Sequence, residues 1–229
     1  MTRKVETTSL KLLCDVQKEL REALNSLGGK QSGGLLEHYL FYMAVHINRA
    51  TEGYVFLRQA SRLDASRLLI RPAIEAMIRI LAIRKDPSLL YRIAYTERME
   101  DRKWVRPSAI RAGRNYDAED EKEWMEFTKK YTAEFPAHRL EEKELRLREA
   151  ATTADAESYY DSHYRLYCRF THAAFGAATG SLDDTHAEDN EAMAACAYCG
   201  LDAVASFGGG APNLVSLGNR LMGEGKSGN

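Results

Sequence analysis

The chain has 229 residues and a mass of 25.8 kDa, which is enough for one large domain with its own core. Ala and Leu far outnumber Val and Ile, and Gly (16) and Pro (5) are scarce, which excludes an ordinary β-sandwich and disfavours a parallel sheet. Because 32 Lys and Arg balance 33 Asp and Glu, the whole chain lacks a basic field typical of nucleic-acid binding, although this balance does not exclude a local patch.

No stretch reaches the ~18 uninterrupted apolar residues that a membrane span needs, and the amphipathic start lacks the apolar segment of a signal peptide. We therefore predict a cytoplasmic protein with no membrane partner. The four cysteines, which include Cys196 and Cys199, fall within apolar helical patterns, and we expect them to be reduced. Since this Cys-x-x-Cys has no second pair and no pair of Glu-x-x-His motifs occurs, we expect neither a metal nor another cofactor.

Apolar residues at spacings of three and four predict helices over residues 9–27 and 35–61. A third helix is predicted over 64–85, with Asp64 as its N-cap. Its apolar residues extend almost all round, so we expect this helix at the centre of the fold. Pro72 should either kink the helix or mark a later start.

The next part of the chain alternates helical patterns with polar connections. Asp86 and Pro87 predict the start of a helix that continues to about residue 105. A helix with an aromatic stripe is predicted from Asp117 to the residue before Pro136. The heavily charged segment 138–150 predicts a solvated helix.

Two helices are predicted in the last third of the chain. Asp155 is the expected N-cap of an aromatic-rich helix over 157–176. Thr185 and Glu188 form a capping box for a final long helix through about residue 207. The fold prediction is thus an all-α, single-domain bundle of about eight helices over residues 1–222, with 157–176 packed beside 64–85 and a disordered tail over 223–229.

Two polar groups stand out against these patterns. Arg71, Glu75 and Arg79 are four residues apart, so they lie on one narrow stripe of the predicted central helix, where both arginines can pair with the one carboxylate. The stripe either faces bulk water or lines a polar cleft; surface pairs of this kind contribute only about 0.3–0.5 kcal/mol each.

The second group lies on the predicted aromatic-rich helix. Arg165, Cys168, Arg169 and His172 share one face at spacings of three and four, with Tyr164 at its border. A histidine exchanges protons near neutral pH and a guanidinium holds an anion, which are the two requirements of phosphodiester transfer. The alternative is that His172 is a hydrogen-bonded histidine of the core or of an interface.

The order of these residues resembles that of a family of uncharacterised bacterial and phage helical proteins. Those proteins show Arg-x-x-x-Glu followed by Tyr-x-x-x-Ser-x-x-x-His, matched here by Arg71 and Glu75 and then by Tyr164 and His172 over roughly residues 40–180. This chain has Cys168 where serine is usual. The family has no function that the resemblance can transfer.

Arg165 followed by His172 is also similar to the Arg-x(4–6)-His motif of HEPN domains (higher eukaryotes and prokaryotes nucleotide-binding). The resemblance implies a HEPN-like, metal-independent endoribonuclease of a bacterial toxin or phage-defence system that acts on single-stranded RNA as a homodimer. In this scheme His172 is the general acid and base, while Arg165 or Arg169 stabilises the phosphoryl oxygens. Glu75 orients one of these side chains, and Arg71, Arg79 and Tyr164 complete the phosphate site.

A non-catalytic module is the alternative function. In that case the Arg/Glu stripe and the aromatic helix bind a small anionic ligand or a protein partner, and no proton transfer is needed. A homodimer is expected in either case, because Tyr159, Tyr160, Tyr164 and Tyr167 and the long helix 35–61 supply more apolar and aromatic surface than one buried stripe requires.

Overall fold

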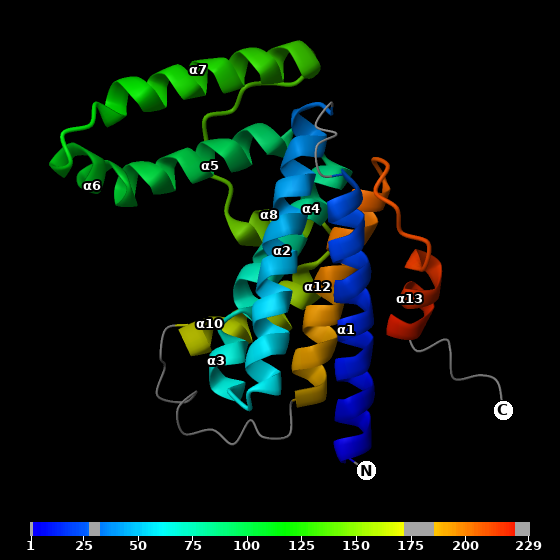
Figure 1. Ribbon diagram of the computed structural model, residues 1–229. Helices are drawn as coiled ribbons and strands as arrows, with labels where there is room; N and C mark the ends of the chain where they lie inside the picture. Colours follow the sequence, from blue (N-terminus) through cyan, green and yellow to red (C-terminus); the bar gives the residue numbers. More distant parts are fainter. Residues whose placement is uncertain (1, 28–32, 172–185, 223–229) are drawn as a thin grey trace.

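A computed structural model describes residues 2–27, 33–171 and 186–222 (Figure 1). Every regular element in these ranges is helical, so the predicted all-α class is confirmed. The predicted disordered tail over 223–229 and the predicted cap at Thr185 lie outside the described residues. Among the described helices none is both long and apolar enough to cross a bilayer.

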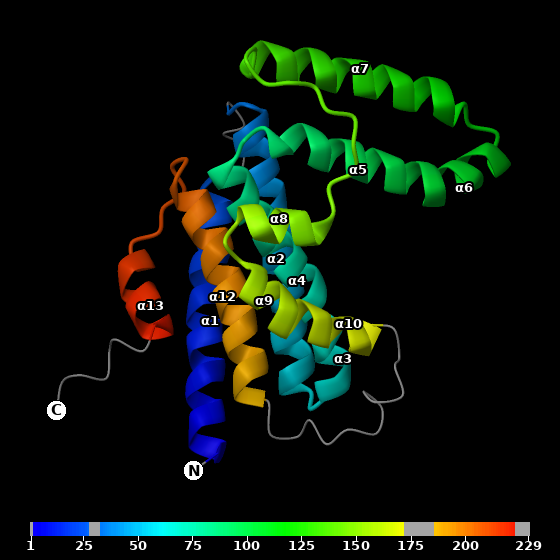
Figure 2. The same cartoon turned by 180° about the vertical axis from the view of Figure 1, so that it is seen from behind.

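Four long helices form the body of the molecule. They are α1 (Thr2–Leu27), α2 (Leu35–Gln59), α4 (Ile70–Lys85) and α12 (His186–Ala205). In Figures 1 and 2, α12 runs beside α1, and α2 and α4 pack on the other side of α12. The short helix α13 (Leu214–Leu221) packs against α1 and α12.

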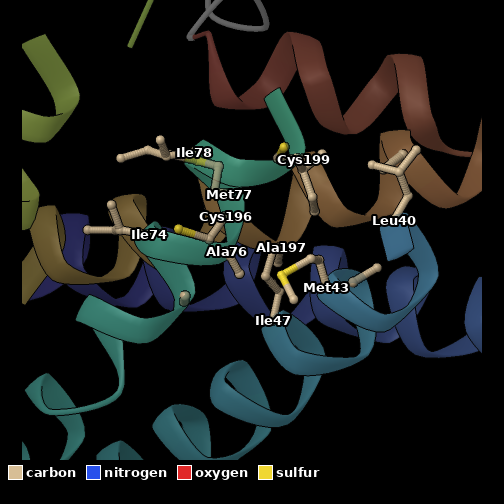
Figure 3. Close-up of a cluster of buried hydrophobic side chains, with 14 of the residues drawn as sticks. Leu40, Met43, Ile47, Ile74, Ala76, Met77, Ile78, Cys196, Ala197 and Cys199 are labelled. Carbon is tan, nitrogen blue, oxygen red and sulfur yellow. The ribbon is translucent and has the colours of Figure 1, made fainter. Parts of the chain in front are cut away.

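The predicted central position of α4 is confirmed. Three of its isoleucines, Ile74, Ile78 and Ile80, are fully buried, and each such side chain contributes about 1.5–3 kcal/mol when it leaves water. Figure 3 shows side chains of α2, α4 and α12 meeting in one cluster. The thiols of Cys196 and Cys199 lie in that cluster, and burial raises the pKa of Cys199 to about 12, so it is a packing residue at neutral pH.

Pro72 marks a helix start and causes no kink. The predicted helix over 64–85 is two helices, α3 (Leu63–Arg67) and α4, and the expected cap Asp64 lies inside α3. Pro72 occupies the first turn of α4, where the backbone N–H that proline lacks would have no partner within the helix.

A helical hairpin, which we call the arm, projects from the body (Figures 1 and 2). It consists of α5 (Leu89–Trp104), α6 (Arg106–Arg111) and α7 (Tyr116–Glu134). The buried residues of α5 end at Ile93, and farther along the helix Arg98 and Arg102 pair with Asp120 of α7 at 2.8 and 2.6 Å. Aromatic rings join the two long helices of the arm and continue the core of the body, with the ring centroid of Tyr91 5.1 Å from that of Trp124 and 5.2 Å from that of Tyr131.

The prediction of a helix over 138–150 is wrong before residue 147. Between α7 and α8 (Leu147–Thr153), backbone groups of residues 143–145 form hydrogen bonds with side chains of α5. The Leu145 N–H donates to Thr96 Oγ1 at 2.7 Å, and the Arg92 guanidinium donates to the carbonyl oxygens of Lys143 and Glu144 at 3.4 and 3.3 Å. These tertiary bonds satisfy the backbone of a segment whose charged surface alone suggested a solvated helix.

The predicted helix over 157–176 is divided into α9 (Glu157–Tyr159), a π-helical turn η1 (Tyr160–Tyr164) and α10 (Arg165–Thr171). Asp155 is not its cap. The residue has a φ of 54° and its carboxylate pairs with Lys85, while Ala156 precedes the first helical residue. As predicted, this segment packs beside α4, through both η1 and α10.

Candidate functional site

The polar stripe of α4 forms a network with α5. The Arg79 guanidinium donates to Glu75 Oε1 and to Glu97 Oε1, both at 2.8 Å. The side chain of Arg79 is only 21% exposed. The network is therefore partly desolvated, unlike an ion pair on a surface that faces bulk water. Glu97 was not among the residues predicted from the sequence, although it continues the inward stripe of Leu90 and Ile93 at helical spacing.

Tyr39 of α2 completes the network by donating its hydroxyl to Glu97 Oε1 at 2.7 Å. Burial raises the pKa of the Glu97 carboxyl, although Tyr39 and Arg79 pull it down. Burial lowers the pKa of Arg79, but the neighbouring Tyr39, Glu75 and Glu97 outweigh that effect, so the guanidinium stays charged. Three helices thus hold one arginine between two carboxylates.

This network lines a pocket of about 230 Å³ between α2, α4 and α5, which we call the α2–α4 pocket. Each carboxylate uses only Oε1 in the network. Among the residues that the structure describes, none donates to Oε2 of Glu75 or of Glu97. Apolar and aromatic side chains complete the wall, and the whole lining is Tyr42, Met43, His46, Pro72, Glu75, Ala76, Arg79 and Glu97.

Arg71, one turn before Glu75 on α4, contacts the end of η1. Its guanidinium carbon lies 5.5 Å from the ring centroid of Tyr164, and its Nη2 donates to the Tyr164 hydroxyl at 3.4 Å. Burial and then the charge of Glu75 raise the pKa of Tyr164. Hence the structure brings together the predicted residues Arg71, Glu75, Arg79 and Tyr164 along one edge of α4.

The structure does not place Arg165 with this group. Its side chain is 68% exposed and pairs with Asp161 Oδ1 at 3.4 Å, one turn earlier on the same helical segment. The side chain of Arg169 and the whole of His172 lie outside the described residues, so their expected roles stay predictions.

A buried cluster that sequence analysis missed fixes the position of α10. Asp189, near the start of α12, accepts the Arg67 Nε–H at 2.9 Å and the Tyr167 hydroxyl at 2.6 Å. The side chains of Arg67 and Asp189 are only 5% and 2% exposed. The next residue, Asn190, accepts the Tyr54 hydroxyl at 2.9 Å and donates to Ser9 Oγ at 3.1 Å.

This Asp189–Asn190 cluster therefore connects α1, α2, α3 and α10 to α12. The sequence contains only a weak signal for this cluster. Asn190 precedes Met193 and Ala197 on the inward stripe of α12, which places a polar residue where an apolar one is expected.

The tyrosines that predicted a homodimer pack within the chain itself. Tyr167 belongs to the cluster just described, Tyr159 donates to the carbonyl oxygen of Ala192 at 3.3 Å, and the rings of Tyr160 and Tyr164 stack with centroids 5.1 Å apart. Their number in the sequence is thus explained by internal packing.

The fold and site define an all-helical protein that carries a partly buried Arg-x-x-x-Glu-x-x-x-Arg stripe on its central helix. The chain belongs to the family of unknown function DUF5677, whose model matches residues 37–191. That range contains the α2–α4 pocket and every residue of the Asp189–Asn190 cluster except Ser9. No curated protein and no solved structure matches the chain.

Proposed function

We propose that this chain is a binding module whose α2–α4 pocket takes a small ligand with N–H donor groups. The observation that carries the proposal is that Glu75 and Glu97, on two different helices, each keep one carboxylate oxygen without a donor in the described part of the chain. Preformed acceptors of this kind cost little to organise when a ligand arrives.

The charges of the pocket favour a donor over the anion expected from the arginines. Arg79 already serves two carboxylates, so the wall has two negative groups for one positive group. An ammonium, amidinium or amide group would pair with the two free oxygens, and charge-assisted bonds of this type are about twice as strong as neutral ones. Met43, Pro72 and the exposed ring of Tyr42 would contact an apolar part of the ligand.

The pocket size limits the ligand. A volume of about 230 Å³ lies below the roughly 300–1,000 Å³ of drug-sized sites. Diamines, short guanidino compounds and amino-acid amides are therefore the compounds to screen first.

The binding prediction concerns Glu75→Gln. We expect an amine that raises the thermal midpoint of the wild-type protein to bind the variant about 10- to 100-fold more weakly, because a hydrogen bond to a charged group contributes ~1.5–3 kcal/mol. Isothermal titration calorimetry measures the loss directly, and Glu97→Gln should reproduce it.

Glu119→Gln is the matched control, because Glu119 lies exposed on α7 away from the pocket. It should bind like the wild type. If simple carboxylates and phosphates stabilise the protein and amines do not, the donor proposal is wrong.

A second candidate function is the HEPN-like endoribonuclease of a toxin or phage-defence system acting in the cytoplasm. The contact between Arg71 and Tyr164 favours it, because this contact brings the helix that carries Arg165 to the edge of α4 that carries Glu75. His172 follows directly after the end of α10. In this proposal His172 removes the proton of a 2′-hydroxyl, the oxygen attacks the adjacent phosphorus, and the 5′-oxygen leaves with a proton.

The ribonuclease candidate predicts cleavage of single-stranded RNA in EDTA, with products that end in 2′,3′-cyclic phosphate. His172→Ala should lower the rate at least ~100-fold, the usual contribution of general acid and base catalysis, while the exposed His38→Ala variant keeps it. Light scattering on the same samples should give twice 25.8 kDa, as a homodimer requires. Cleavage that persists in His172→Ala would sink the candidate.

A further inference from the structure

The end of the arm carries an unusual surface. We call residues 102–114 the tip; α6, which it contains, lies at the far end of the arm in Figures 1 and 2. Trp104 is 76% exposed there, Val105 41% and Ile110 49%. Single exposed apolar side chains are ordinary on a surface, but here three large ones occur within seven residues.

The tip is also strongly basic. Residues 102–114 include five cationic residues and no acidic one. Three of the cations have carboxylate partners: Arg102 pairs with Asp120, Lys103 with Glu100 and Arg106 with Asp117.

The other two cations have none among the described residues. Arg111 donates only to Ser108 Oγ, at 3.2 Å, and Arg114 is exposed without a side-chain partner. Two guanidinium groups are thus available to an anionic partner.

Helical geometry places the aromatic ring and one of these arginines on the same side. The Val105 N–H donates to the Asp101 carbonyl at 2.8 Å and the Ala109 N–H donates to the Val105 carbonyl at 2.9 Å, so the helical turn continues from α5 into α6. Trp104, Ser108 and Arg111 are spaced by four and three residues and therefore share one face.

The polar N–H group of the Trp104 indole already has a hydrogen-bond partner within the chain. Its Nε1–H donates to Glu100 Oε2 at 3.1 Å. What the ring offers to a partner is therefore its π face. A tryptophan at a membrane surface uses the same N–H toward headgroups, so this arrangement favours a flat stacking partner over a lipid.

We propose that the tip binds single-stranded nucleic acid, with a base stacked on Trp104 and backbone phosphates on Arg111 and Arg114. Aromatic stacking beside guanidinium groups is the chemistry that single strands require, and it tolerates any base sequence. The site is separate from the α2–α4 pocket and depends on neither candidate function.

The test measures the anisotropy of fluorescein-labelled 12-nucleotide RNA and DNA single strands at low salt. We expect R111E/R114E to weaken binding at least tenfold and W104A about tenfold. K129E/K130E, which makes the same charge change on exposed residues of α7 away from the tip, should stay within about twofold. Circular dichroism of each variant confirms that it folds.

Stacking has its own signature. Saturation with the single strand should quench the tryptophan emission of the wild type, and W104F should remove that quenching. His172→Ala should bind like the wild type, which separates this site from the ribonuclease candidate. The proposal is overturned if K129E/K130E lowers the affinity as much as R111E/R114E does. It is also overturned if the wild type fails to bind single strands at about 100 µM, which is the order of the weakest non-specific dissociation constants, or if only vesicles of acidic phospholipid bind the tip.

Discussion

Replacing Asp189 with alanine should lower the free energy of unfolding by about 3–5 kcal/mol, the usual cost of removing one partner from a buried ion pair. The variant leaves the Arg67 guanidinium, which is 5% exposed, without its nearest carboxylate. It also removes the acceptor of the Tyr167 hydroxyl, which is equally buried. Since these partners belong to α3 and α10, we expect α10 to loosen first.

Urea unfolding followed by far-ultraviolet circular dichroism measures this loss. The matched control is Asp15→Ala, because Asp15 also pairs with an arginine, Arg220, at 2.8 Å, but with a side chain that is 41% exposed. An exposed pair contributes only about 0.2–1 kcal/mol. Equal losses in the two variants would show that burial of the Asp189 carboxylate contributes nothing to stability.

Replacing Arg79 with methionine should lower the free energy of unfolding by about 2–3 kcal/mol at pH 7.5, because Glu75 and Glu97 then face each other without a cation. Methionine keeps the length of the side chain and most of its packing. The loss should be smaller at pH 5 than at pH 7.5.

The sign of this pH dependence follows from Glu97. Burial already raises the pKa of its carboxyl, and Arg79 is one of the two groups that lower it. Without the arginine, the pKa rises further above that of the unfolded chain, so the folded state binds more protons and loses stability as the pH rises through this range. The double variant R79M/E97Q should remove most of the dependence; urea unfolding at both pH values tests it, and a loss independent of pH would contradict the account.

Local patterns in the sequence identified the helices because helical periodicity and caps act within a few residues. The approximate positions of α1, α2, α5, α7 and α12 follow from apolar and aromatic spacing together with the start signals at Asp86 and Thr185, although α1 begins at Thr2 and not at residue 9. Proline chemistry also allowed a late helix start, and α4 begins at Ile70 with Pro72 in its first turn. The boundary at Asp155 failed because a left-handed residue and an ion pair to Lys85, both tertiary features, override its preference as a cap.

Only the part of the candidate site that lies on α4 could be predicted from the sequence. The spacing of Arg71, Glu75 and Arg79 is local to one helix and could be read directly. Glu97 and Tyr39 come from other helices, and their distances from Arg79 depend on how three helices pack. The same reason hid Asp189, whose partners lie 122 and 22 residues away along the chain.

The arm determines what an optical unfolding experiment reports. The chain has two tryptophans, Trp104 and Trp124, and both belong to the arm. Fluorescence therefore follows the melting of the arm, whereas circular dichroism sums over all helices. If the arm unfolds before the body, the fluorescence and circular dichroism transitions will have different midpoints. Unfolding is then not two-state, and the fluorescence midpoint does not report the stability of the core around α4.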